Sequence, residues 1–363
     1  SWKQVIGGDG TWTAIDPDDP EGIYASYQYL GNIFFSQNSG QSWYGLNPPG
    51  GQELTSFVAP YVVCPSNSET IYAGRTCVYK TTDQGAYWRK TNKLEPLDGN
   101  PVLCLAVSTQ NEDIVYASTA PVNTRAGVFL TVDGGLNWRN CTSDLPDRYP
   151  VDIAVDPFVP ATAYVVFSGF GSGHVYKTTD EGRSWQDVGT GLPDVPTSAV
   201  AVDPFDRSIV YVGNDIGVYV TMDNGETWQR FTEGLPPAMI VMDISTVEVN
   251  QSLRVVTHGN GVYEGRLVRR SEKEVVDNFK LRQNYPNPFN AVTSIPIELP
   301  KSEDIVINIY NARGRKVDTI VKEHYPPGTY ALRWEAGENA SGIYIARVTC
   351  GRWKKSIKMV LVR

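Results

Sequence analysis

Scattered acidic residues in turn-rich segments are the side chains of this chain that could do catalytic chemistry. The best placed are Asp9, Asp147 and Asp215. A glycosidase needs two carboxyl groups held roughly 5–10 Å apart, and no spacing in the sequence pairs any two of these. Each could equally be a solvated or turn-capping aspartate. The sequence therefore offers weak catalytic candidates and no catalytic motif.

Similar segments carry residues that could bind a ligand. Flat aromatic rings stack on sugars, and a small number of polar groups orient a bound ligand. The candidates are Tyr27, Tyr29, Arg75, Arg125, Arg148 and His258. His258 lies in Thr257-His-Gly-Asn-Gly-Val-Tyr263, so a structural turn is the alternative to a general base.

The sequence gives no sign of a metal or cofactor. It has no Gly-rich phosphate loop, no Ser-His-Asp arrangement and no zinc motif. The five cysteines form no CxxC or Cys/His spacing, and we expect no metal site. One disulfide among Cys64, Cys77 and Cys104 is possible in an oxidising compartment, and the alternative is that most cysteines are small buried hydrophobic residues.

The elements that must position these residues come from a repeat. Thr178-Thr-Asp-Glu-Gly-Arg-Ser-Trp185 is one of five copies of a single motif. The shared positions are Asn38, Gly40 and Trp43; Asp83, Gly85 and Trp88; Asp133, Gly135 and Trp138; Asp180, Gly182 and Trp185; and Asp223, Gly225 and Trp228. The tryptophans recur about every 45 residues, and short strands fill the intervals, which is typical of a β-propeller.

The motif itself predicts structure rather than catalysis. Its carboxylate can accept hydrogen bonds from the backbone of its own hairpin. Its glycine supplies a positive φ, and its tryptophan can pack between neighbouring repeats. We therefore interpret these aspartates as structural, not as catalytic groups or metal ligands.

This motif resembles the Asp-box (BNR) repeat of sialidases, sortilin-like receptors, xyloglucanases and photosystem-assembly propellers. The resemblance covers residues 1–268 and implies a propeller whose boxes lie on the face opposite the ligand funnel. Five repeats of four strands are expected, followed by three strands between Met239 and Leu267. Ser1-Trp-Lys-Gln-Val5 could close a sixth blade. Because Ser1-Trp2 begins within a motif, we expect a longer precursor and treat six blades as a minimum.

A second module follows a charged linker at residues 269–278. Residues 279–363 alternate apolar and polar positions in six strands, which predicts a small antiparallel β-sandwich. Asn284-Tyr-Pro-Asn-Pro-Phe-Asn290 and Lys358-Met-Val-Leu361 are similar to motifs of the type A sorting domain of the type IX secretion system. The sorting residues are Tyr285, Pro286, Asn287, Pro288, Phe289, Asn290, Lys358 and Met359. The resemblance implies transit through the periplasm of a Gram-negative bacterium, handling by the type IX machinery, and a secreted or surface location.

Composition narrows the partners further. The net charge of −8 disfavours nucleic acid, and no apolar run approaches the roughly 20 residues of a membrane helix. We expect an all-β protein that acts as a binding or scaffold module for an extracellular polysaccharide or a surface protein.

Two other functions are open at this point. The first is a xyloglucanase-like glycoside hydrolase, which Asp9 and Asp215 meeting in one funnel would favour. The second is a sortilin-like peptide-binding propeller, which an apolar central channel would favour. The chain lacks the early Arg-Ile-Pro signature of sialidases, so the resemblance does not imply sialidase activity.

Overall fold

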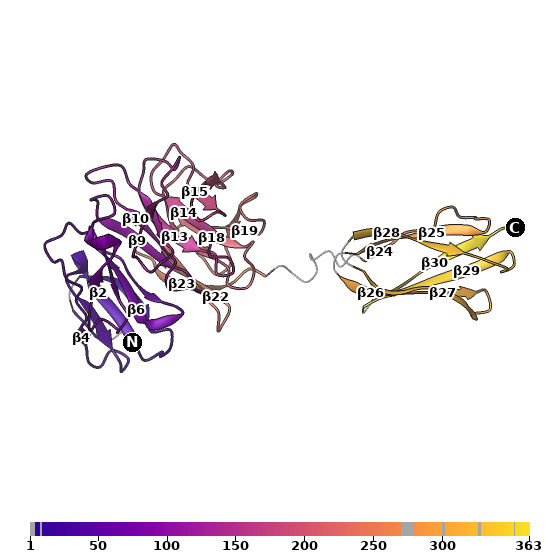
Figure 1. The fold of residues 1–363 in the computed structure, drawn as a ribbon, viewed down its shortest axis with the longest axis horizontal. Coiled ribbons are helices and arrows are strands. Elements are labelled where there is room, and N and C mark those ends of the chain that lie inside the picture. The colour runs from indigo at the N-terminus through magenta and orange to yellow at the C-terminus, as the bar shows by residue number, and fades with distance from the viewer. Residues whose placement is uncertain (1–3, 8, 270–278, 300–301, 326–327, 352) are drawn as a thin grey trace. The chain divides into compact units, whose positions relative to one another are not determined.

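The chain forms two compact units, Ser1–Val268 and Arg269–Arg363. The computed structural model describes residues 4–7, 9–269, 279–299, 302–325, 328–351 and 353–363. Both units consist of antiparallel sheets (Figure 1), which confirms the all-β prediction. Within the described ranges, no helix has the length and hydropathy needed to cross a membrane.

The first unit is a β-propeller made of consecutive up-and-down sheets, which we call blades one to six. Blade one comprises β1 (Gly10–Ile15), β2 (Ile23–Tyr27), β3 (Ile33–Ser36) and β4 (Tyr44–Gly45). Blade two comprises β5 (Tyr61–Cys64), β6 (Asn67–Gly74), β7 (Val78–Thr81) and β8 (Arg89–Lys90). Blade three comprises β9 (Val102–Val107), β10 (Val115–Thr119), β11 (Val128–Thr131) and β12 (Arg139–Asn140). Two 3-10 turns, η1 (Gln28–Leu30) and η2 (Asn92–Leu94), lie in the connecting loops.

The next three blades continue this order. Blade four comprises β13 (Pro150–Val155), β14 (Ala163–Phe167), β15 (Val175–Thr178) and β16 (Gln186–Asp187). Blade five comprises β17 (Thr197–Val202), β18 (Val210–Asn214), β19 (Gly217–Thr221) and β20 (Gln229–Phe231). Blade six comprises β21 (Val241–Val247), β22 (Ser252–Thr257) and β23 (Gly261–Arg266), three strands among the described residues. The strand predicted to complete it, at residues 1–5, lies mostly outside the described residues, and Gln4 and Val5 are not in a strand.

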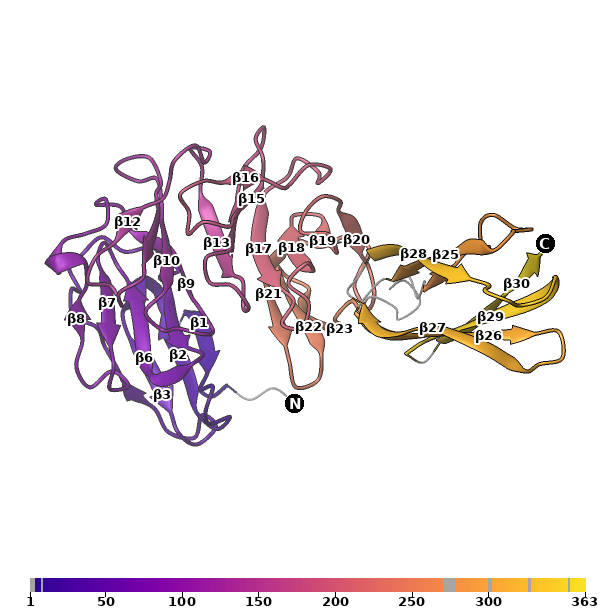
Figure 2. The same cartoon turned by 45° about the vertical axis from the view of Figure 1, so that its right-hand side comes forward.

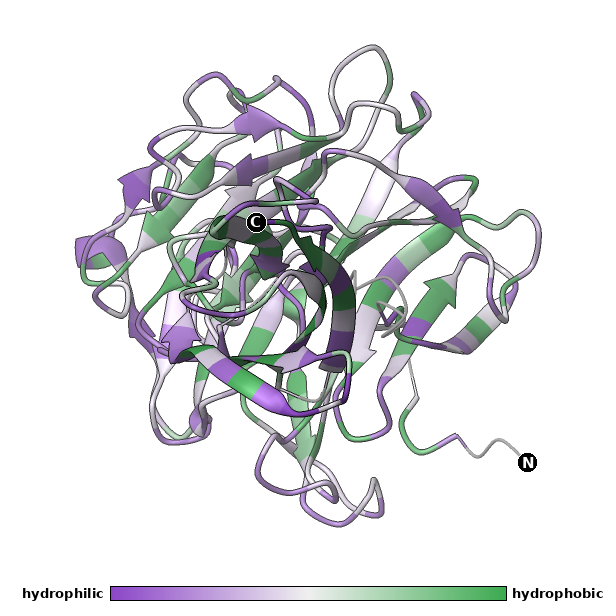
Figure 3. Cartoon of the chain, turned by 90° about the vertical axis from the view of Figure 1, so that its right-hand side faces the viewer, coloured by the Kyte–Doolittle hydropathy of each residue, from purple (hydrophilic) through white to green (hydrophobic). Residues whose placement is uncertain are grey.

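Each blade packs flat against the next through side chains on both faces of its sheet. The second strands are rich in β-branched and aromatic residues, which favour strands. Each of the first five blades buries one tyrosine there completely: Tyr24, Tyr72, Tyr116, Tyr164 and Tyr211. Five apolar clusters join successive blades from one to six, and Figure 3 shows the apolar colour concentrated on the strands.

The order of strands fixes which loops share a face of the propeller. First strands of neighbouring blades contact one another, so they form the inner layer of the propeller (β13, β17 and β21 in Figure 2). Because the strands of a blade run antiparallel, the turns between first and second strands lie at the same end as the Asp boxes. We call this end the box face. The loops between second and third strands and the connections between blades form the opposite end, the connection face.

The second unit is a sandwich of two antiparallel sheets, as predicted. One sheet contains β24 (Lys280–Leu281), β25 (Val292–Leu299) and β28 (Gly328–Glu335). The other contains β26 (Glu303–Asn311), β27 (Lys316–Tyr325), β29 (Gly342–Cys350) and β30 (Trp353–Leu361). Trp334, Phe289 and Met359 lie in its buried core. The core thus contains residues from both predicted sorting motifs.

Candidate functional site

The Asp boxes form hydrogen-bonded turns. In blade four, Asp180 Oδ1 accepts a hydrogen bond from Ser184 N at 2.9 Å, and Thr178 Oγ1 accepts one from Gly182 N at 2.8 Å. Gly182 has φ +72°, and a Cβ there would lie 2.9 Å from Cys141 Cβ. The Ser184 hydroxyl is the main cause that lowers the pKa of Asp180 to about 2. The carboxylate is therefore held ionised by its own turn.

The box tryptophans join neighbouring blades. Trp185 Nε1 donates to the carbonyl oxygen of Cys141 at 2.8 Å, and Trp228 Nε1 donates to that of Val188 at 2.7 Å. Trp138 Nε1 donates to Thr91 Oγ1 at 3.0 Å. Each of these three bonds crosses from one blade to the loop of the preceding blade.

The three predicted catalytic acids are not brought together by any contact. Asp9 precedes β1, and its carbonyl oxygen accepts a hydrogen bond from Gln28 N at 3.3 Å. Asp147 is exposed in the connection between blades three and four, and Asp215 lies in the turn between β18 and β19. In the part of the chain that the structure describes, no hydrogen bond or ion pair joins any two of them.

The three predicted arginines have separate partners. Arg75 is only 4% exposed, and its guanidinium donates to the carbonyl oxygens of Tyr29 at 3.2 Å and Leu30 at 2.9 Å. This position corrects the prediction that Arg75 contacts a ligand, because the side chain is buried and its two terminal nitrogens donate to backbone. Among the described residues, its buried Nε has no hydrogen-bond partner. Arg125 donates to the carbonyl oxygen of Leu145. Arg148 lies against Gly169.

The backbone that Arg75 holds presents an exposed aromatic pair on the connection face. Tyr29 and Phe57 are each 53% exposed, and their rings meet edge to face with centroids 5.2 Å apart. Tyr29 N donates to the carbonyl oxygen of Phe57 at 2.8 Å, which ties the two loops together. Tyr27, also predicted, is half-buried and packs edge-on against Phe34. Tyr29 is therefore the more accessible of the two predicted tyrosines.

Phe170 is a second exposed aromatic residue, and polar groups hold its loop. Phe170 is exposed in the β14–β15 loop, and Asp194 Oδ1 accepts a hydrogen bond from Gly171 N at 2.7 Å. His174 Nε2 lies 3.0 Å from the same carboxylate oxygen. These bonds, the Gly171 one first, lower the pKa of Asp194. By contrast, the predicted His258 is exposed, and its backbone N–H donates to the carbonyl oxygen of Ile240.

Two acids on the axial strands were missed by the sequence analysis. Asp152 on β13 and Asp243 on β21 occupy the same register position, each beside a bulge at the start of its strand. Asp152 Oδ2 accepts a hydrogen bond from Val200 N at 2.9 Å, and its Oδ1 accepts one from Ile153 N at 2.8 Å. Cys104 Sγ on β9 lies 3.6 Å from Asp152 Oδ1. Both residues are half-buried.

Burial perturbs this axial group. It raises the pKa of Asp152 to about 7, with the negative charge of Asp243 acting in the same direction and the Val200 hydrogen bond opposing it. Burial also raises the pKa of Asp243 and of the Cys104 thiol. Acids with such shifts cluster at functional sites. Within the described ranges, no group of three or more metal-binding side chains is present, and Cys64, Cys77, Cys104 and Cys141 are free and buried.

One signal in the sequence could have identified these acids. In Val151-Asp-Ile-Ala-Val155 and Val241-Met-Asp-Ile244 a single aspartate interrupts an apolar first strand. First strands of neighbouring blades contact one another, so a carboxylate there lies between first strands, as Asp152 does between Cys104 and Val200. The presence of two axial acids also differs from the apolar channel expected of a sortilin-like propeller.

In the second unit, the two predicted sorting motifs lie against each other. Phe289 N donates to the carbonyl oxygen of Val360 at 2.9 Å. Asn287 Oδ1 accepts from Val360 N at 2.8 Å, and Asn287 Nδ2 donates to the carbonyl oxygen of Lys358 at 3.3 Å. Phe289 also packs on Trp334, with ring centroids 5.5 Å apart. Tyr285 and Lys358 remain exposed.

Comparison with known protein families identifies this second unit. Residues 283–362 match the secretion system C-terminal sorting domain. The chain thus carries a type IX sorting domain, which directs it to the cell surface or the medium. No curated protein matches the chain in sequence.

Solved structures show the fold of the rest. The GH74 enzyme of Niastella koreensis is 16% identical with a TM-score of 0.54, over 98% of this chain and 66% of that one. An ancestral GH74 enzyme is 14% identical with a TM-score of 0.54, over 97% and 62%. The extracellular domain of a two component system from B. thetaiotaomicron is 12% identical with a TM-score of 0.50, over 84% and 39%. The chain spans less than two thirds of the length of each.

Proposed function

We propose that the propeller is an extracellular binding module for polysaccharide, exported by the sorting domain that follows it. The observation that carries this proposal is the exposed Tyr29–Phe57 pair on the connection face. Aromatic rings are the usual platforms for sugar rings, because they offer a flat apolar face at a small entropic cost.

The platform is rigid before any ligand arrives. Arg75 is buried beneath it and donates to two consecutive carbonyl groups of the Tyr29 loop. Tyr29 and Leu30 have φ of 55° and 52°, a left-handed conformation that non-glycine residues adopt only when the surroundings impose it. A preformed surface avoids the ordering cost of a flexible loop, which favours binding.

The proposal is tested by affinity electrophoresis of the full-length protein in gels containing xyloglucan, xylan, mannan, β-glucan or pectin. We expect retardation by at least one polymer. Tyr29→Ala/Phe57→Ala should weaken that binding at least tenfold, since aromatic anchors dominate interfaces.

A matched control removes two aromatic rings from the opposite end. Phe158 and Phe205 are 41% and 48% exposed in the first turns of blades four and five, on the box face. Phe158→Ala/Phe205→Ala should bind as the wild type does. Equal loss in both double variants, or no retardation by any polymer, would contradict the proposal and leave a surface protein as the alternative partner.

A second candidate function is glycoside hydrolysis, and the axial acids favour it. A general acid must hold its proton near neutral pH, and the pKa of Asp152 at about 7 meets this requirement. Asp243 would supply the second carboxyl group. The hydrolase hypothesis thus moves from Asp9 and Asp215 to Asp152 and Asp243, with Asp9, Asp147 and Asp215 left as weaker candidates.

A further inference from the structure

A groove between blades four and five contains a half-buried lysine, Lys177. The cavity has a volume of about 640 Å³ and lies beside the Asp box of blade five. Its lining includes Lys177, Arg207, Asn224, Asp187, Thr190 and Glu226. None of these residues contacts the Tyr29–Phe57 pair described above.

Lys177 is half-buried and is held in a defined position. Its Nζ lies 5.3 Å from the centroid of the Tyr164 ring and donates to Asn224 Oδ1 at 3.0 Å. Among the described residues, no carboxylate oxygen forms an ion pair with it. Burial, then the positive charge of Arg207, lowers its pKa, and the negative charge of Asp156 opposes this shift. Lys177 is therefore a half-buried ammonium group without a direct ion pair among the described residues, which is costly away from water.

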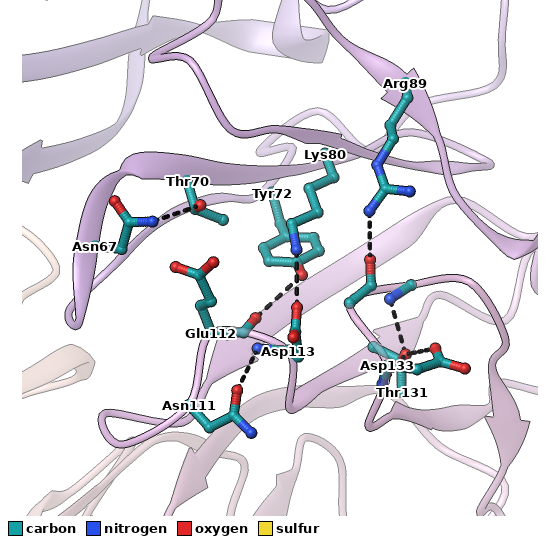
Figure 4. A network of polar contacts seen from close by, with 12 residues as sticks. Asn67, Thr70, Tyr72, Lys80, Arg89, Asn111, Glu112, Asp113, Thr131 and Asp133 are labelled. Carbon is teal, nitrogen blue, oxygen red and sulfur yellow. Dashed lines mark hydrogen bonds and ion pairs between the residues drawn. The ribbon is translucent and has the colours of Figure 1, made fainter.

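The equivalent lysine of blade two, Lys80, has an acidic partner. Lys80 occupies the register of Lys177, in the identical sequence Val-Tyr-Lys-Thr-Thr-Asp. Its Nζ lies 5.1 Å from the Tyr72 ring centroid and 3.0 Å from Asp113 Oδ1 (Figure 4). Gly134, which corresponds to Asn224, fits closely over this pair, since a Cβ there would lie 2.4 Å from Asp113 Oδ1. Lys80 is thus neutralised and covered.

Blade five has no acid at the two positions where blade three has Glu112 and Asp113. Alignment of Val115-Tyr116 with Val210-Tyr211 places Arg207-Ser208 opposite Glu112-Asp113. Arg207 is itself paired, because its Nε and Nη2 each lie 2.9 Å from Asp156 Oδ2. Its side chain remains 43% exposed, so it can still donate to a ligand. Asp156 thus pairs directly with Arg207, and among the described residues Lys177 has no direct ion pair.

Three acids line the groove, and among the described residues none of them forms an ion pair with Lys177. Asp223 is half-buried and accepts from Thr221 and Thr227 within its own box. Asp187 Oδ1 accepts from Gly189 N at 2.8 Å. Asp187 and Glu226 are exposed, so water and salt screen their charges.

We propose that this groove binds the carboxylate of an acidic sugar, a uronate unit of a polysaccharide, through Lys177 and Arg207. The volume lies in the range of small-molecule sites. Thr190, Asp187 and Glu226 provide the mixed donors and acceptors that sugar hydroxyls require. The site is separate from the Tyr29–Phe57 pair and does not rest on the function proposed for it.

The test is calorimetric titration of the full-length protein with trigalacturonate and with its methyl ester, which lacks the charge. The acid should bind at least tenfold more tightly than the ester. Lys177→Leu should reduce affinity for the acid at least tenfold. This variant should fold, because Leu130 occupies the same register in blade three. Lys93→Leu, which removes an exposed charge elsewhere on the propeller, is the control and should bind normally.

A second variant adds the missing acid without removing the lysine. Asn224→Asp keeps the shape of the side chain, and aspartate tolerates the φ of 63° at this position. It should neutralise Lys177, raise the melting temperature and abolish binding of the acid. The proposal is overturned if the acid does not bind, if the ester binds equally, or if the folded Lys177→Leu and Asn224→Asp proteins bind as the wild type does.

Discussion

Replacing Asp152 by asparagine should change how the stability of the propeller depends on pH. In the folded protein the pKa of Asp152 is raised from 3.8 to about 7, chiefly by burial. The folded state therefore binds more protons than the unfolded state between these two values. Its stabilisation is complete below about pH 4 and is lost as the pH rises through about 7. Asparagine does not titrate, so this loss should vanish.

The magnitude follows from the shift. One pKa unit corresponds to about 1.4 kcal/mol, so the full shift is worth about 4 kcal/mol, and partial exposure of the side chain reduces this to about 2–4 kcal/mol. Asparagine has one acceptor oxygen where Asp152 uses two, for Val200 N and Ile153 N. That loss costs about 1 kcal/mol. The variant should be less stable than the wild type at pH 4 and more stable at pH 8.

Urea unfolding of both proteins, followed by tryptophan fluorescence at pH 4, 6 and 8, measures this difference. The free energy of unfolding of the variant, relative to the wild type, should rise by about 2–4 kcal/mol across the range. Ser56→Ala, an uncharged change, should show no such trend. Parallel pH profiles for wild type and Asp152→Asn would refute the claim that a neutral carboxyl group lies on the axis.

Three further predictions concern the box turns, blade packing and export. Asp180→Ala should lower the free energy of unfolding by about 1–2 kcal/mol at pH 7, measured by chemical denaturation. Because the pKa of Asp180 is lowered to about 2, this difference from the wild type should disappear as the pH falls from about 4 towards 2. Gly182→Ala should destabilise the protein by at least about 1 kcal/mol, because the φ of Gly182 is +72° and the added methyl group would contact Cys141. The control, Gly10→Ala, adds a methyl group in open space and should melt near the wild-type temperature. Deleting residues 279–363 should stop export, with the truncated protein retained in the periplasm on immunoblots; its normal appearance in the medium would contradict the role of the sorting domain.

Repeated features were predictable from the sequence because each is determined locally. The Asp-box turn is specified by Thr178, Asp180 and Gly182, whose bonds all fall within seven residues. The five repeats of four strands were predicted for the same reason. The sorting unit was equally predictable, because its two motifs contact each other, with Phe289 N donating to the carbonyl oxygen of Val360.

Non-repeated features were not predictable, because they depend on contacts across blades. The sequence Gly-Arg-Thr is typical of a surface turn, so it predicts an exposed Arg75. The guanidinium is buried because the Tyr29 loop of the preceding blade covers it. Asp152 reads as the polar member of an alternating strand, yet its neighbours are Cys104 and Val200, both about 48 residues away. Lys177 and Lys80 share one sequence, and their difference comes from Asp113 and Arg207 on the following blades.

The measurement that tests the central claim most directly is mass spectrometry of the five polysaccharides after incubation with the full-length protein, beside affinity electrophoresis of the same samples. The binding-module account predicts retention on at least one polymer, dependent on Tyr29 and Phe57, with no oligosaccharides released. Oligosaccharides released by the wild type but not by Asp152→Asn/Asp243→Asn would contradict it and make the propeller a hydrolase with an axial active site.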